Sequence, residues 1–427
     1  MSTLPDLNQK NHVTSLSVMM FLQFFVWGAW YVSMTGFMGA QQMGGLGAAA
    51  YSVGPIAAII SPFFLGLVAD RFFATQRVLG ALHLLGALAL FAAPAMAKPF
   101  NPETDGSAFA HPFIIVLLLH MLCYMPTLGL TGSISFHNLS NREKQFPLVR
   151  VWGTIGWIVG NIVVGGNLKT FGLDVVWIPE GDASSLQFYV AGGAAVLLGL
   201  FSFVALPNTP PPAKGQAVTV RQIIGVDSIK LLAKPSYLVF IICSFLLCIP
   251  LAFYYIQARN YVAANGFTNP TLTMSFGQMS EILFMVVMPL CFARLGVKWM
   301  LAIGMLAWVV RYGLFAGAWD GHVGWMVVGA ILLHGICYDF FFVTGMIYVD
   351  QSAHKEIRSQ AQGFLVLATQ GLGMLIGAQA FGWWVNKKTE SGVLDWPGFW
   401  MAPAIFAAAI LVVFVLFFRA APADRKE

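Results

Sequence analysis

Four ionisable side chains lie inside long apolar stretches of this 427-residue sequence: Arg150, Glu281, Arg311 and Asp339. A charged group that is removed from water is costly unless it is paired or faces a wet cavity. These residues are therefore the first place to look for chemistry. Their neighbours at helical spacing indicate which chemistry that would be.

Arg150 begins a polar stripe. Thr154 and Trp157 follow at i+4 and i+7, which places all three side chains on one face of a helix. A guanidinium, a hydroxyl and an indole on one face suit the binding of a polar solute that carries a flat ring. In the structural alternative, Arg150 extends to lipid headgroups and Trp157 only packs.

Gln278 and Glu281 are three residues apart and share a face of another predicted helix. Glu281 is expected inside the helix bundle, where the loss of water favours the uncharged acid. Both residues are candidates for binding a solute, and Glu281 is also a candidate for carrying a proton. A structural ion pair between Glu281 and Arg311 is the alternative.

His334 and Tyr338 are four residues apart, and both are candidates for solute binding. Asp339 lies about 100 degrees further round the same helix. It is the second candidate for carrying a proton. The alternatives are structural pairing for Asp339 and hydrogen-bonded packing for His334.

The composition places these residues in a membrane protein. Hydrophobic residues make up 58% of the chain and charged residues 10%, which is more apolar surface than a soluble core of this length buries. There is no Gly-rich phosphate loop, paired-histidine zinc motif or Gly-x-Ser-x-Gly elbow, and the five cysteines lack metal-ligand spacing. We therefore expect no enzyme activity, no cofactor, no metal and no nucleic-acid partner.

Twelve apolar runs are long enough to cross a bilayer as helices, which need ~20 residues each. The predicted spans are 13–38, 47–69, 77–97, 112–136, 149–171, 187–206, 237–262, 271–293, 297–317, 323–349, 360–385 and 397–419. A polar stretch from Pro207 to Ser236 separates six spans from six. The expected domains are an N-terminal half (1–206), a cytoplasmic linker (207–236) and a C-terminal half (237–427).

The positive charges predict the orientation of the chain. If the termini are cytoplasmic, sixteen Lys and Arg fall on the cytoplasmic side and four on the other side, with three set aside near or within spans. The positive-inside rule therefore predicts that both termini are cytoplasmic.

The loop between the second and third spans resembles the G-x-x-x-D-R signature of the major facilitator superfamily. It runs from Gly66 to Asp70 and Arg71 and closes with Arg77. Asp70 would cap the start of a neighbouring helix, while Arg71 and Arg77 would hold the positive side. We expect conformational gating from these three residues, with a merely solvated turn as the alternative.

Six motifs together resemble the nucleoside:proton symporter family of the major facilitator superfamily. They are Phe21-Leu-Gln-Phe-Phe-Val-Trp-Gly-Ala-Trp30, Tyr124-Met-Pro-Thr-Leu-Gly-Leu130, Arg150-Val-Trp-Gly-Thr-Ile-Gly156, Gln278-Met-Ser-Glu281, Trp308-Val-Val-Arg311 and Tyr338-Asp-Phe-Phe341. The resemblance implies a central cavity between two six-helix halves and uptake of nucleosides with a proton by alternating access. It implies cavity roles for Arg150, Thr154, Gln278, Glu281 and Asp339.

The sequence departs from the family pattern at three cavity positions. His334 occupies a tyrosine position, and an amide pair of the seventh span aligns to Ala252 and Tyr255. Gln257 and Arg259 are candidates to replace that pair, or they face the external mouth. The departures leave the substrate open.

The sequence thus predicts an all-α membrane protein with the major facilitator fold that imports nucleosides with protons across the cytoplasmic membrane. The expected form is a monomer in a lipid bilayer. The alternatives are a transporter of another polar metabolite, such as a sugar, or a transport-inactive membrane sensor on the same scaffold.

Overall fold

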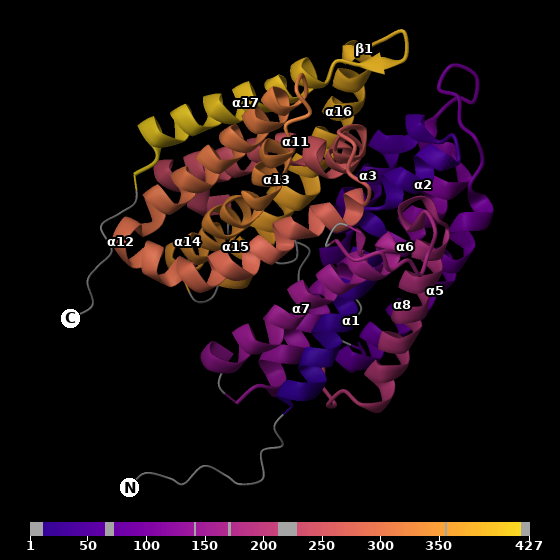
Figure 1. The fold of residues 1–427 in the computed structure, drawn as a ribbon. Helices are drawn as coiled ribbons and strands as arrows, with labels where there is room; N and C mark the ends of the chain where they lie inside the picture. Colours follow the sequence, from indigo (N-terminus) through magenta and orange to yellow (C-terminus); the bar gives the residue numbers. More distant parts are fainter. Residues whose placement is uncertain are drawn as a thin grey trace, which may run out of the picture.

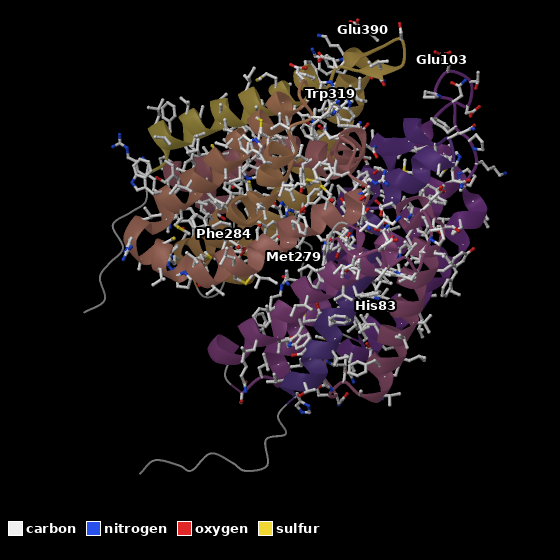
Figure 2. The ribbon with its side chains drawn as sticks, in the orientation of Figure 1. His83, Glu103, Met279, Phe284, Trp319 and Glu390 are labelled. Carbon is white, nitrogen blue, oxygen red and sulfur yellow. The ribbon has the colours of Figure 1, made fainter. Side chains whose placement is uncertain are left out.

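The structure is a computed structural model that describes residues 12–64, 72–140, 142–169, 172–211, 229–354 and 357–419. These residues fold almost entirely into helices, which form two bundles side by side (Figure 1). Side chains fill the space between the helices, as at His83 in the first bundle (Figure 2).

The first bundle contains six predicted spans. Its helices are α1 (Val13–Tyr31), α2 (Met34–Ala40), α3 (Gly47–Phe64), α5 (Thr75–Ala92), α6 (Pro112–Asn138), α7 (Arg142–Gly165) and α8 (Leu186–Val204). Short 3₁₀ turns connect them, namely η1 (Gly44–Leu46), η3 (Ala93–Met96), η4 (Ala108–Ala110) and η6 (Gly181–Ala183).

The second bundle contains the remaining spans. Its elements are η7 (Lys230–Ala233), α11 (Pro235–Ala264), α12 (Pro270–Ala318), α13 (Gly324–Leu332), η8 (Ile336–Val343), α14 (Thr344–Ser352), α15 (Arg358–Val366), η10 (Leu367–Gly373), α16 (Met374–Lys388), β1 (Thr389–Glu390), β2 (Val393–Leu394) and α17 (Trp396–Phe417). The two short strands pair antiparallel, with Thr389 opposite Leu394.

Eleven helical segments of the described chain are long and apolar enough to cross a membrane. The longest, α12, contains two of the predicted spans. Gly296 divides it with φ 65° and ψ 177°, a backbone conformation that essentially only glycine adopts. The prediction of twelve spans is therefore confirmed, although the loop expected between 293 and 297 is a single non-helical residue.

The predicted span 149–171 differs from the helix that forms. Helix α7 begins at Arg142 and ends at Gly165, and Gly166 follows with a positive φ of 75°. Hydropathy missed the start because residues 142–148 include charged side chains. The predicted span also extends past the end of the helix, to Phe171, although Asn167, Lys169 and Thr170 are polar.

Helices α1 and α7 cross closely, and the crossing brings their aromatic side chains together. Gly156 permits it, because a side chain there would meet the backbone of Phe21. As a result, the Trp27 and Trp157 rings pack with their centroids 5.4 Å apart.

Two segments are π-helical: η8, within the span that continues into α14, and η10, within the span that continues into α16. A π-helical turn inserts an extra residue into a helix and is frequent at functional sites. Tyr338 and Asp339 lie on η8, and Gln370 lies on η10.

Candidate substrate site

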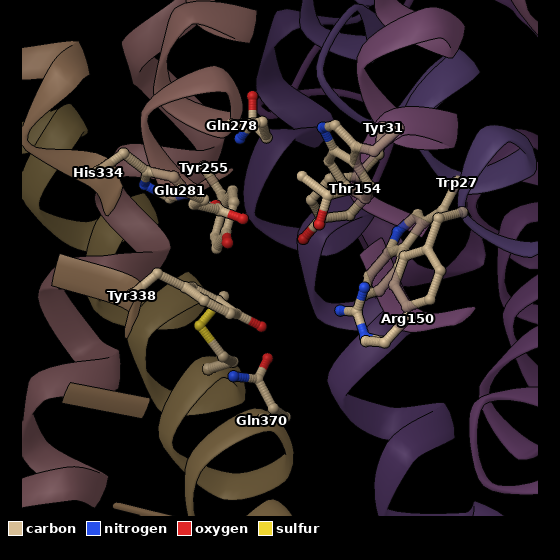
Figure 3. A pocket seen from close by; sticks show the side chains of 13 residues that line it. Trp27, Tyr31, Arg150, Thr154, Tyr255, Gln278, Glu281, His334, Tyr338 and Gln370 are labelled. Carbon is tan, nitrogen blue, oxygen red and sulfur yellow. The ribbon is translucent and has the colours of Figure 1, made fainter. Parts of the chain in front are cut away.

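A pocket lies between the two bundles, and both contribute to its walls (Figure 3). It encloses about 680 Å³, including its open mouth. The first bundle supplies Phe24, Trp27, Tyr31, Arg150, Thr154 and Trp157. The second supplies Tyr255, Gln278, Glu281, His334, Tyr338, Gln370 and Met374.

The polar stripe on α7 lines this pocket as its spacing predicted. The guanidinium carbon of Arg150 lies 4.4 Å from the centre of the Phe24 ring. Its Nη1 is buried and has no hydrogen-bond partner among the described residues. The side chain thus lies in the pocket, rather than extending to headgroups.

Glu281 lies in the wall opposite α7, beside Gln278. Only 8% of Glu281 is exposed, and its Oε1 is 2.9 Å from Nε2 of His334. The direct ion pair considered between Glu281 and Arg311 does not form, because His334 lies between them and contacts Arg311 with its other nitrogen.

Asp339 is fully buried and does not line the pocket, although its neighbour Tyr338 does. Neither oxygen of the Asp339 carboxyl group has a hydrogen-bond partner within the described residues. The structural pairing that was the alternative for Asp339 is therefore not found there. The position keeps Asp339 apart from direct contact with a solute in the pocket.

The expected gating residues are placed only in part. Asp70 and Arg71 lie outside the described residues, while Arg77 is exposed in the first turn of α5. Nearby, the Thr75 N–H donates to the Thr209 carbonyl at 2.8 Å, which ties this end of α5 to the chain after α8. The gating role of the three residues remains a prediction.

Several pocket residues were not predicted from the sequence. Gln370 is an amide inside the predicted span 360–385, so the rule that singled out Glu281 would have found it. Tyr31, Phe24 and Met374 gave no signal, because aromatic and apolar residues at membrane depth are usually packing. Ala252 is buried and does not line the pocket, whereas Tyr255 does.

Two other polar side chains at membrane depth have structural partners instead. Gln23 donates to Thr127 Oγ1 at 2.7 Å, and its Oε1 lies 2.8 Å from His83 Nε2, inside the first bundle. Arg259 donates to Asp182 Oδ2 at 3.1 Å. Neither Gln23 nor Arg259 lines the pocket.

Comparison with known proteins decides the family. The nucleoside H⁺ symporter family matches residues 11–423. The chain belongs to this family. The putative nucleoside transporter YegT of Escherichia coli is 38% identical over 95% of this chain and 93% of its own. The nucleoside permease NupG of the same organism is 30% identical over 95% of each chain.

A solved structure supports the fold of this nucleoside H⁺ symporter family member. The crystal structure of the nucleoside transporter NupG superposes with a TM-score of 0.80 and 29% identity, covering 96% of this chain and all of that one. The prediction of a major facilitator fold with two six-helix halves is confirmed. The chain is a multi-pass membrane transporter rather than an enzyme.

Proposed function

We propose that this chain imports nucleosides together with protons, and that the pocket between the bundles is its substrate site. The observation that carries the proposal is the pocket itself. Aromatic rings, a buried carboxyl group and polar groups that have no partner among the described residues meet there between the two halves. Transporters of this construction bind their solute at the interface of the halves.

The pocket offers the contacts that a nucleoside needs. Arg150 Nη1 and the indole N–H of Trp157 are buried donors without partners in the described structure. Gln278 and Gln370 add amides from the other half. Sugar hydroxyls and base edges would pair these groups, and the indole of Trp157 offers a face on which a base can stack.

Two carboxyl groups are our candidates for the coupled proton. Glu281 faces the pocket, while Asp339 lies behind it without a donor among the described residues. Intramembrane acids of this kind mark proton pathways in transporters. We propose that one or both exchange the proton that travels with the solute.

The halves are joined on the side of the pocket that faces away from the first residues of α1. In the described structure, Asp182 Oδ2 accepts from Arg259 Nη2 at 3.1 Å and from the Thr271 N–H at 3.0 Å, and Gln379 Nε2 donates to Ser52 Oγ at 2.8 Å. The Tyr31 and Tyr255 rings meet with centroids 5.8 Å apart. We infer that these contacts close the outer side of the pocket.

We propose cytoplasmic termini for this carrier, from the distribution of Lys and Arg in its sequence. With that orientation, the conformation described is closed to the outside. A single chain supplies both halves of the pocket, so we propose a monomer in the lipid bilayer.

Counterflow in proteoliposomes tests the substrate class. Labelled uridine, adenosine and several sugars are presented to the purified protein with the same unlabelled solute inside. We expect exchange of the nucleosides and none of the sugars. Exchange of a sugar alone would overturn the nucleoside assignment, and exchange of no solute would support a transport-inactive sensor.

A further inference from the structure

His334 joins a buried arginine to the carboxyl group of the pocket. Its Nε2 lies 2.9 Å from Oε1 of Glu281, and its Nδ1 lies 3.1 Å from Nη1 of Arg311. Arg311 is fully buried and does not line the pocket. Its hydrogen bond toward the site goes to the imidazole ring of His334 (Figure 3 shows His334 beside Glu281).

The partners determine where the imidazole carries its proton. A guanidinium group has only donors, so the hydrogen bond to Arg311 requires Nδ1 of His334 to accept. Nδ1 then carries no hydrogen, and the ring hydrogen must be on Nε2. That N–H points at Glu281 Oε1, so the ring is a neutral imidazole that accepts on one side and donates on the other.

Tyr254 packs against both Arg311 and His334. The guanidinium carbon of Arg311 lies 3.3 Å from the centre of the Tyr254 ring, a cation–π contact at a fully buried position. The His334 ring stacks on Tyr254 with centroids 5.6 Å apart and planes inclined by 21°. The imidazole therefore has little freedom to rotate away from Arg311.

The backbone beside His334 is hydrogen-bonded to the helix that carries Glu281. The Gly335 N–H donates to Ser280 Oγ at 3.0 Å. A side chain at Gly335 would approach the Ser280 carbonyl to 2.7 Å, so only glycine allows this crossing of α12. The separation between His334 and Glu281 is thus set by the backbone as well as by their side chains.

We propose that Arg311 and His334 are positioning residues for Glu281: Arg311 fixes the Nε2–H tautomer of His334, and that N–H holds Glu281 Oε1. The proposal rests on the proposed function of Glu281 in the pocket. We call Arg311, His334 and Glu281 the carboxyl relay.

The carboxyl relay leaves one oxygen of Glu281, Oε2, available to bind a solute or a proton. A guanidinium in direct contact would bind both oxygens in a bidentate pair. A neutral imidazole makes one hydrogen bond, so Oε2 of Glu281 stays available to the pocket. His334 thus orients Glu281 without locking it in an ion pair with Arg311.

Substitutions that keep or remove the two hydrogen bonds of His334 test the carboxyl relay. In His334→Gln, the amide oxygen accepts from Arg311 and the amide N–H donates to Glu281, so we expect nucleoside affinity within about threefold of wild type. His334→Phe keeps a ring without either hydrogen bond and should lower affinity about tenfold. A His334→Gln variant that melts like wild type but binds as weakly as His334→Phe would overturn the proposal.

Arg311→Met completes a double-mutant cycle. Because the hydrogen bond from Arg311 toward the site goes to His334, Arg311→Met alone should weaken binding about tenfold, and in the His334→Phe background it should weaken binding much less. Losses that multiply in the double variant would show that Arg311 acts on its own, which contradicts the relay.

Nitrogen-15 NMR of labelled histidine measures the tautomer and charge of His334, and it needs no substrate. The His334 signal is assigned by its absence in His334→Gln, and we expect a neutral ring with hydrogen on Nε2 that becomes a tautomer mixture in Arg311→Met. A charged ring or hydrogen on Nδ1 would overturn the relay. If wild type binds no nucleoside but this spectrum is as expected, the proposed substrate fails and the positioning of Glu281 stands.

Discussion

Gln278 reaches the pocket with an amide that has no hydrogen-bond partner among the described residues. If it binds the nucleoside, Gln278→Ala leaves a polar group of the solute unpaired, at roughly 1 to 3 kcal/mol or about 5- to 150-fold in affinity. Equilibrium binding to the purified variant measures this loss.

Gln41→Ala is the control for that measurement, because Gln41 is exposed and lies outside the pocket. We expect it to bind nucleoside as wild type does. Wild-type affinity in Gln278→Ala, with an unchanged melting temperature, would show that Gln278 does not contact the substrate.

The two buried carboxyl groups are tested by isosteric amides. Glu281→Gln and Asp339→Asn keep the volume of each side chain but bind no transported proton. We expect at least one of the two variants to lose accumulation driven by a pH gradient while it keeps measurable counterflow. If both retain wild-type accumulation, the coupling site lies elsewhere.

Residue types at helical spacing predicted much of the pocket, but not its hydrogen bonds. Arg150, Thr154 and Trp157 share a stripe because they share a helix, which a local pattern reveals. Contact between His334 and Glu281 depends on two helices crossing at Gly335, and no local pattern encodes that crossing. Arg311 was for this reason considered as a direct partner of Glu281, although His334 separates them.

At the scale of elements, Gly296 separates the two spans of α12. Its Cβ position is open, so Gly296→Ala meets no atom and its cost is the backbone strain of a positive φ, of order 1–3 kcal/mol. We expect a lower melting temperature in detergent.

Gly313→Ala is the matched control in the same element, since Gly313 is helical and its Cβ position is also open. Alanine favours a helix over glycine by about 1 kcal/mol, so this variant should melt at or above the wild-type temperature. Equal melting of the two variants would mean that the break at Gly296 does not depend on its backbone conformation.

The spans themselves were predictable because apolar length is a local property of the chain. Their internal irregularities were not. The π-helical segments η8 and η10 keep the same apolar composition as a regular helix, so hydropathy does not distinguish them. The short break at Gly296 was overestimated as a loop because Arg294 and Lys298 are polar on either side of it.

At the scale of the whole molecule, the orientation in the membrane is open to a labelling experiment. Single cysteines are placed in the 207–236 linker or in the 98–111 loop, in a chain whose five native cysteines are replaced. An impermeant maleimide applied to intact cells should label only the loop. Labelling of the linker alone would reverse the orientation.

The closure of one side of the pocket could not be predicted from the sequence. Asp182 lies in the short turn η6 and its partner Arg259 lies on α11 of the other half. Such a pairing between distant segments leaves no periodic pattern. The sequence therefore predicted the two halves and their shared cavity, while the conformation that relates them required the structure.

Uptake of labelled uridine by proteoliposomes under an imposed pH gradient tests proton-coupled nucleoside transport most directly. With the outside more acidic, we expect internal uridine to rise above the external concentration, and a protonophore should abolish the excess. Entry that only equilibrates uridine, with the same rate and extent with or without the gradient, would contradict symport with protons.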